Sequence, residues 1–298
     1  MSKYLYSNEI LLEASKKLKK FNILSPELDA SLLLSHAVNY RGKLYSHNKI
    51  LISKSQFNTF NTLLEARIKG KPVSRILGYK NFWKKKFLIN KFTLDPRPDS
   101  EIIVEAALNK ISCKLEKTQI LDIGAGSGCL GLSLIDEMPN SSLLSLDKCI
   151  KALNQIILNA ENLNVLKRVE VMKLDWFKNN WEKTVKIKTV NSNLFNKDKF
   201  KIIVCNPPYI KSKDIVKLDV EVKNYDPLIS LDGGNDGCES YRAILGNLSS
   251  LLDNDGTCFL EIGYNSLDNV KKIIKKFNFN IIKVHKDYNN IDRVLEIN

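Results

Sequence analysis

The sequence has few of the residues that build metal centres, disulfide frameworks or membrane spans. Its six cysteines lie at least 16 residues apart, so no pair has the short spacing of a zinc knuckle or a redox motif. The three histidines are scattered, and we expect them to be structural. No apolar run reaches the roughly 18 residues that a bilayer span needs, and the N-terminus lacks the pattern of a signal peptide. We therefore expect reduced thiols, no bound metal, and a soluble cytoplasmic protein.

Arginine is also scarce, since it supplies only seven of the 46 basic residues. The formal net charge is nonetheless +13, from 46 basic and 33 acidic residues. This charge favours partners rich in phosphate, because clustered cations speed association with polyanions. Asn, Ile and Lys are abundant along the whole chain, so a lysine-rich genome explains the charge equally well.

The length of 298 residues suggests two domains. We expect residues 1–72 to form a small all-helical domain that docks a partner, since no chemistry is visible in this region. Ser25-Pro26 has the pattern of a helix start, and Gly70 is expected to end the last helix. Apolar residues at helical spacing mark two faces, namely Ile10, Leu11, Ala14 and Leu18, then Phe57, Phe60, Leu63, Leu64 and Ile68.

Residues 73–96 are predicted to form a linker that contains a hairpin. Between Lys80 and Leu94 there is no acidic residue, and lysines alternate with aromatic side chains. Basic residues interleaved with aromatics can bind single-stranded nucleic acid. A half-buried amphipathic pair of strands produces the same pattern, so both interpretations remain open at this point.

Residues 97–298 alternate between strand-like and helical patterns. This alternation predicts an α/β domain with a doubly wound, mostly parallel seven-stranded sheet, whose last two strands form an antiparallel edge. Ligands of such sheets bind beyond the carboxyl ends of the strands. The seven predicted strands are residues 119–123, 143–146, 169–172, 201–205, 257–262, 281–285 and 294–297.

A glycine-rich loop follows the first of these strands. Glycines allow a tight turn and a close approach of the backbone to a ligand. The loop is not a dinucleotide fingerprint, because Cys129 stands where the third glycine is needed, and it lacks the lysine of a P-loop. It suits the amino-acid half of S-adenosylmethionine, so we expect cofactor contacts from Gly124, Ala125, Gly126, Ser127 and Gly128.

Two further side chains follow the next two strands. Asp147 ends the second strand, where a carboxylate can accept both ribose hydroxyls. Trp176 follows the third strand and would place its ring near an adenine. Taken singly, Asp147 could be a helix cap and Trp176 a core aromatic. Three such features at three successive strand ends favour a cofactor site.

A second motif, Asn206-Pro207-Pro208-Tyr209, follows the fourth strand. The two prolines remove N–H donors, so this stiff loop presents carbonyl oxygens. That arrangement suits a substrate with an NH2 group. The Asn206 side-chain oxygen and the Pro207 carbonyl would each accept one hydrogen, while Tyr209 packs on the planar face. The pair of motifs predicts methyl transfer to a planar nitrogen, with Asn206, Pro207 and Tyr209 as the catalytic residues.

Together the two motifs resemble amino-methyltransferases with an N-P-P-Y signature, which act on adenine N6, guanine N2 or protein glutamine. The rest of the chain narrows this choice to a resemblance to the HemK/PrmC family. The residues that carry it are Pro72-Val73 through Gly78, Asn81-Phe82-Trp83, Pro96-Arg97-Pro98-Asp99-Ser100-Glu101, Asp175-Trp176-Phe177, Asp287-Tyr288 and Asp292-Arg293-Val294.

This resemblance implies a class I, Rossmann-like methyltransferase fold. It implies a monomer that uses S-adenosylmethionine to methylate the glutamine amide in the Gly-Gly-Gln loop of peptide-chain release factors. The helical domain would contact the release factor, and nucleic-acid binding would not be required. Residues 124–128, Asp147, Trp176 and Asn206 would contact the cofactor, and Asn206, Pro207, Pro208 and Tyr209 would hold the glutamine.

Three points stand apart from this resemblance. Leu94-Asp95 and Ser100 differ from the usual family residues in ways that are tolerable. Residues 178–199 are rich in lysine and asparagine, and we expect them to be a mobile surface insertion.

Two alternative functions are a nucleic-acid amino-methyltransferase acting on adenine N6 or guanine N2, and a degenerate methyltransferase that serves as a binding module. The intact motifs argue against the latter.

Overall fold

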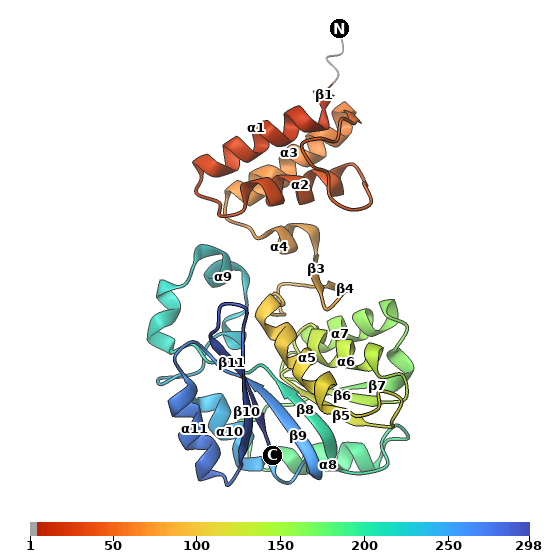
Figure 1. Cartoon of the computed structure of the whole chain (residues 1–298), viewed down its shortest axis with the longest axis vertical. Coiled ribbons are helices and arrows are strands. Elements are labelled where there is room, and N and C mark those ends of the chain that lie inside the picture. The colour runs from red at the N-terminus through yellow and green to blue at the C-terminus, as the bar shows by residue number, and fades with distance from the viewer. Residues whose placement is uncertain (1–4) are drawn as a thin grey trace. The chain divides into compact units, whose positions relative to one another are not determined.

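A computed structural model describes residues 5–298, and the chain divides into two compact units (Figure 1). The helical unit comprises the residues up to Tyr79 together with Asp219–Tyr225. The sheet unit comprises Lys80–Leu218 and Asp226–Asn298. The boundary between the units falls within the predicted linker over residues 73–96, since its first part belongs to the helical unit and the remainder to the sheet unit.

The helical unit is built around a buried apolar core contributed by its three long helices. Leu18, Leu33 and Leu34 are each fully buried in this core. It also contains a short antiparallel strand pair that was not predicted. The elements are β1 (Leu5–Tyr6), α1 (Ser7–Lys20), α2 (Pro26–Ala37), β2 (Leu51–Ile52), α3 (Lys54–Ile68), α4 (Val73–Leu77) and α9 (Val220–Tyr225).

Two predicted helix boundaries in this unit need refinement. Helix α2 does begin at Pro26, but the Ser25 hydroxyl donates to Asp29 Oδ1 at 2.9 Å instead of capping the backbone. Gly70 follows α3 in a left-handed conformation (φ 84°), as expected. It does not end the last helix, because α4 follows and ends at the left-handed Gly78.

A buried arginine connects three elements of the helical unit. The Arg67 side chain is 4% exposed; its Nε lies 2.6 Å from Asp29 of α2 and its Nη2 lies 2.5 Å from Glu221 of α9. Segment 219–225 lies far along the chain, after the acceptor motif, and sequence patterning did not associate it with the helices. A buried guanidinium needs such partners, because an unpaired buried charge is strongly destabilising.

The predicted hairpin is present as β3 (Tyr79–Phe82) and β4 (Lys85–Leu88). Phe82 and Phe87 are buried and pack edge to face at 6.1 Å, while Lys85 pairs with Asp136 at 2.8 Å. The structure therefore supports the amphipathic strand pair over a single-strand binding surface. Trp83 and Lys84 take positive φ at the turn, as tight hairpins require.

All seven predicted strands of the large sheet are confirmed, within a few residues at each end. Their order is β10-β11-β9-β8-β5-β6-β7, and β11 alone runs antiparallel to its neighbours. The last two strands, β10 and β11, form the antiparallel pair at the edge of the sheet, as predicted. The strands are β5 (Gln119–Ile123), β6 (Ser142–Asp147), β7 (Val169–Lys173), β8 (Phe200–Cys205), β9 (Leu252–Glu261), β10 (Ile281–Lys286) and β11 (Asp292–Ile297).

Helices cover the sheet with two separate cores. One cluster holds residues of α5, α6 and α7, and the other holds residues of α8, α10 and α11, which is the doubly wound arrangement. The α-helices are α5 (Glu101–Lys110), α6 (Cys129–Glu137), α7 (Ile150–Asn162), α8 (Trp181–Val190), α10 (Glu239–Leu248) and α11 (Leu267–Lys276). The 3-10 helices are η1 (Pro98–Ser100), η2 (Leu166–Arg168), η3 (Ser212–Lys217) and η4 (Leu228–Ser230).

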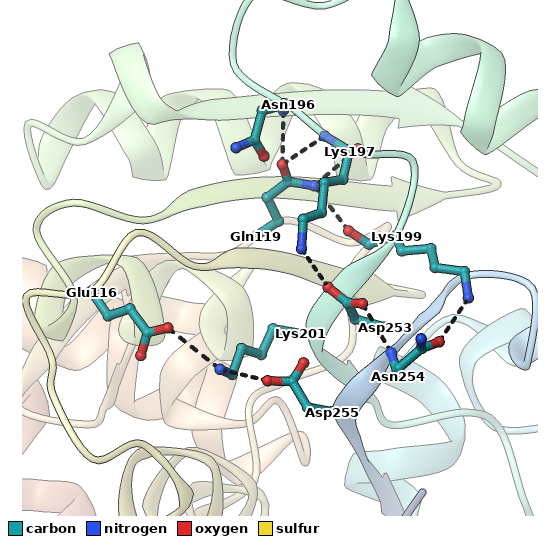
Figure 2. Close-up of polar contacts among 9 residues, drawn as sticks. All are labelled: Glu116, Gln119, Asn196, Lys197, Lys199, Lys201, Asp253, Asn254 and Asp255. Carbon is teal, nitrogen blue, oxygen red and sulfur yellow. Dashed lines mark hydrogen bonds and ion pairs between the residues drawn. The ribbon is translucent and has the colours of Figure 1, made fainter.

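Residues 178–199 are not a mobile surface insertion, so that prediction was wrong. They contain α8, whose Trp181 and Val185 enter the core together with Phe195. The end of the segment is held by Gln119, which accepts from Asn196 N at 2.8 Å and donates to the Lys199 carbonyl at 2.9 Å (Figure 2). Because the segment is rich in lysine and asparagine, its sequence pattern did not reveal the three buried apolar side chains, Trp181, Val185 and Phe195.

Among residues 5–298, no helix combines the length and apolar character that a membrane crossing requires.

Candidate active site

A cavity of about 520 Å³ opens at the carboxyl ends of four neighbouring parallel strands. Gly124 follows β5, Asp147 ends β6, Asp175 follows β7 and Asn206 follows β8, and all four line this cavity. The volume lies within the roughly 300–1,000 Å³ that is typical of small-molecule sites. The fold thus brings together residues that lie more than 80 positions apart, where a ligand of such a sheet is expected.

The glycine loop forms one wall of the cavity. The amides of Gly124 and Ala125 both donate to the Leu146 carbonyl at 2.9 Å, and the Gly126 amide donates to Asp147 Oδ2 at 2.9 Å. Gly124 has φ 76°, and a Cβ there would lie 3.0 Å from the Trp176 ring. The loop therefore needs glycine for both its conformation and its contact with that ring.

Gly128 is the one loop residue that does not line the cavity. It precedes α6 with φ 80°, and a Cβ there would lie 3.0 Å from Leu132 and 3.1 Å from Ile156. Its position serves the close packing of α6 against α7. Ser127 does line the cavity, and its carbonyl accepts from the buried side chain of Asn159 at 2.9 Å.

Asp122, which opens the glycine motif, is completely buried and does not line the cavity. Its Oδ2 accepts from the Gly131 amide at 3.0 Å, which ties the end of β5 to α6. Burial raises the pKa of this carboxyl to about 7, and the nearby Asp147 raises it further while the Gly131 bond lowers it.

Asp147 holds the loop while it faces the cavity. Its two oxygens accept from the Gly126 amide and, at 2.7 Å, from the Cys149 amide. Burial raises the pKa of this carboxyl, and the two backbone hydrogen bonds partly oppose the shift. Each carboxylate oxygen can accept more than one hydrogen bond, so Asp147 retains acceptor capacity towards a ligand hydroxyl.

Trp176 forms another wall of the cavity. Its indole Nε1 is buried and has no hydrogen-bond partner within the described residues 5–298. Because this donor lies at the wall of the cavity, it is available to an acceptor that a ligand would supply. The neighbouring Asp175 pairs with Lys148 at 2.8 Å, and both also line the cavity.

The acceptor motif divides into residues at the cavity and residues behind it. Asn206 and Pro208 line the cavity, whereas Pro207 and Tyr209 do not. The Asn206 side-chain nitrogen donates to Ser100 Oγ at 3.1 Å. The Tyr209 hydroxyl donates to Glu261 Oε1 at 3.2 Å, so it points to the sheet side of the motif.

Ser100 and Glu261 were not among the predicted site residues. Glu261 ends β9 and is 1% exposed, and its Oε2 accepts from the Ser100 hydroxyl at 2.5 Å. Burial raises the pKa of Glu261 to about 7, although hydrogen bonds from Ser100 and Tyr209 and the charge of Arg293 lower it. The available sequence signal was a carboxylate at the end of an otherwise apolar strand, 259–261.

None of the three histidines lines the cavity. His285 lies 3.1 Å from Glu296 in the β10–β11 hairpin, and His47 stacks on Tyr45 in the helical unit. Within residues 5–298, no group of three or more His, Cys, Asp or Glu side chains has an arrangement that could hold a metal ion.

The strand order, the single antiparallel strand β11 and the cavity at the carboxyl ends define a class I, S-adenosylmethionine-dependent methyltransferase fold. The solved catalytic domain of hMettl16, in complex with MAT2A 3'UTR hairpin 6, is similar in fold, with a TM-score of 0.50. It is 16% identical, and the match covers 70% of this chain and 74% of that one.

Two family descriptions match the chain: the PrmC N-terminal domain over residues 9–78, and the methyltransferase small domain over residues 98–222. A release factor glutamine methyltransferase from Agrobacterium fabrum is 32% identical over 289 residues, which cover 96% of this chain and 94% of that protein. The chain belongs to the release factor glutamine methyltransferase family.

The chain also resembles longer proteins. A bifunctional methyltransferase from Rickettsia typhi is 32% identical over 310 residues, which cover 97% of this chain. The match covers 56% of that protein, so the chain spans just over half the length of this relative.

Proposed function

We propose that the protein transfers a methyl group from S-adenosylmethionine to the side-chain amide nitrogen of the glutamine in the Gly-Gly-Gln motif of peptide-chain release factors. One observation carries this proposal: the Asn206 amide uses its nitrogen to bind Ser100, which leaves its oxygen as the group offered to a substrate. An oxygen acceptor at this position suits an acceptor group with N–H bonds. Family membership and the activity named for the Agrobacterium relative support the choice of glutamine.

The lining of the cavity fits the cofactor in chemistry as well as size. In the proposal, Gly124, Ala125, Gly126 and Ser127 hold its amino-acid half, Asp147 accepts from its ribose, and Trp176 packs beside its adenine. Bound there, the cofactor supplies an electrophilic methyl group. Trp176 Nε1, which has no partner among residues 5–298, and the half-buried carboxylate of Asp147 are two polar groups that such a ligand would contact.

The acceptor chemistry needs orientation more than proton removal. An amide nitrogen is a poor nucleophile, because its lone pair is delocalised into the carbonyl. In the proposal, Asn206 Oδ1 accepts one of its hydrogens and helps to aim the lone pair at the methyl group, which favours the transition state over the planar ground state. The Pro207 carbonyl, predicted to accept the second hydrogen, belongs to a residue that does not line the cavity, so its contact with the substrate stays a prediction. The proton can leave after the transfer, so no general base is assigned. Tyr209 positions the motif through its bond to Glu261.

The charge of the cavity argues against a nucleic-acid acceptor. Both cations in the described lining, Arg97 and Lys148, are paired with acids, at 2.5 Å to Asp226 and 2.8 Å to Asp175. Four lining residues expose apolar side chains, which suits a polypeptide loop better than a phosphate backbone; these are Phe92, Phe177, Leu228 and Ile229. Recognition of the release factor by the helical unit, a monomeric state and a cytoplasmic location belong to the same proposal.

Incubation with labelled S-adenosylmethionine tests the proposal. The substrates are a release factor, its variant with the loop glutamine replaced by alanine, and total RNA and DNA. We expect label in the release factor only, with none in the alanine variant. Labelled nucleic acid beside an unlabelled release factor would overturn the proposal.

A further inference from the structure

A chain of hydrogen bonds connects the acceptor motif to one buried carboxylate. Asn206 Nδ2 donates to Ser100 Oγ at 3.1 Å, and the Ser100 hydroxyl donates to Glu261 Oε2 at 2.5 Å. The other oxygen of Glu261 accepts from the Tyr209 hydroxyl at 3.2 Å. Both ends of the Asn206–Tyr209 motif are therefore held by Glu261, which is 1% exposed and does not line the cavity.

The single proton of the Ser100 hydroxyl makes this chain directional. An ionised carboxylate can only accept, so the hydroxyl proton must point to Glu261, and the Ser100 oxygen can then only accept from its other neighbour. The Asn206 amide must present its nitrogen to Ser100 and its oxygen to the cavity. A neutral Glu261 could donate to Ser100, and the hydroxyl could then donate to Asn206 Oδ1, which would turn the amide nitrogen towards the substrate.

The rest of the surroundings hold Glu261 in place. The Tyr241 hydroxyl donates to the Glu261 backbone carbonyl at 2.9 Å. Arg293 pairs with Asp287 at 2.9 Å and with Asp99 at 3.3 Å, so its charge is shared with two other carboxylates. The charged and titratable groups that interact with Glu261 are Arg293, Asp99, Tyr209, Tyr241, Cys205 and Cys129, while Ser100 supplies its shortest hydrogen bond.

We propose that ionised Glu261 is a positioning residue that, through Ser100, fixes the Asn206 amide with its oxygen towards the acceptor nitrogen. This inference rests on the proposed function, because it assigns the reason why Asn206 can accept from an amide. The orientation of the Asn206 amide then depends on the charge of Glu261, whose side chain does not contact the substrate. The site is then competent with Glu261 ionised and loses its orientation when Glu261 is protonated.

The pH dependence of turnover follows from this geometry. Because burial raises the pKa of Glu261 to about 7, protonation falls within an accessible pH range. We expect kcat to decrease as pH falls through about 7, and comparison with Glu261→Gln separates this effect from the protonation of Asp122, whose pKa burial also raises to about 7. In Glu261→Gln this acid limb should disappear, because the carboxamide does not titrate. Persistence of the same acid limb in that variant would overturn the assignment of the titration to Glu261.

Substitution of Ser100 tests the connection itself. Ser100→Ala removes the hydroxyl that connects Asn206 to Glu261, and we expect kcat to fall roughly 10- to 100-fold with the cofactor Kd unchanged. Ser100→Thr restores a hydroxyl and should recover most of that loss. Ser145→Ala is the matched control, because Ser145 is also fully buried but has no side-chain partner in the described structure, and kcat should not change. An Ala variant with wild-type kcat would overturn the proposal.

A measurement without substrate separates this inference from the proposed function. The side-chain amide of Asn206 gives a ¹⁵N–¹H correlation whose shift should follow the titration of Glu261 in the wild-type protein and be constant in Glu261→Gln. If the shift titrates but release factor is not methylated, the positioning role stands and the proposed function fails. If release factor is methylated but the shift does not titrate, the function stands and the positioning role fails.

Discussion

Gly124 and Trp176 lie in direct contact, so close that a Cβ at Gly124 would come within 3.0 Å of two carbons of the indole ring. One residue follows β5 and the other follows β7, so their contact joins two walls of the cavity. The loop that would hold the amino-acid half of the cofactor and the ring that would pack beside the adenine therefore depend on one another.

Gly124→Ala should weaken cofactor binding at least about tenfold, because the methyl group displaces the Trp176 ring and strains a residue with positive φ. Isothermal titration with S-adenosylmethionine measures this loss. Gly78→Ala is the matched control, since Gly78 has nearly the same φ of 77° but a Cβ there meets nothing within 4 Å. The control should lose about 1 kcal/mol of stability and bind the cofactor normally. Equal affinities for both variants would contradict the role of the contact.

Asn206→Ala should bind the cofactor nearly as well as the wild-type protein and lose turnover by roughly 100- to 1,000-fold, as expected when one oriented polar group is removed from a reacting centre. Single-turnover methylation of a release factor gives the rate, and titration gives the affinity. Asn254→Ala, on the exposed network of Figure 2, serves as the control and should retain wild-type rates. Near wild-type turnover of Asn206→Ala would exclude the acceptor mechanism.

Arg67→Met should destabilise the helical unit by about 3–5 kcal/mol, because it leaves the buried Asp29 without its partner. Glu221→Gln removes the other ion pair, but Glu221 is 41% exposed, so the loss should stay below about 1 kcal/mol. Urea unfolding followed by circular dichroism distinguishes the two variants. Similar midpoints for both would show that the buried pair with Asp29 contributes little.

Trp181→Ala should lower the free energy of unfolding by about 3–5 kcal/mol, since this side chain is 2% exposed in the core beneath α8. The exposed Ile187 of the same helix is the control, and Ile187→Ala should change stability by less than about 0.5 kcal/mol. Thermal unfolding measures both. An unaffected Trp181→Ala variant would support the earlier interpretation of residues 178–199 as a surface insertion.

Much of the sheet could be predicted, because strands buried on both faces appear as short apolar runs between helical patterns. Residues 120–123 and 202–205 are of this kind, and both became central strands. Helix α8 could not be recognised in the same way, since its three lysines outnumber its two buried apolar residues, Trp181 and Val185. The antiparallel pair at the edge, β10 and β11, could be predicted because no long helix separates the two strands along the chain.

The sequence by itself determined the seven strands, the glycine loop and the placement of Asp147, Trp176 and Asn206 after successive strands, because each of these follows from local spacing. Only the tertiary structure decided that Ser100 and Glu261, which are 161 positions apart, meet behind Asn206. It also decided that segment 219–225 joins the helical unit. These contacts depend on the order of the strands in the sheet and on where the chain comes back after residue 218. A hydrogen bond between distant residues leaves no periodic pattern in the sequence around either residue.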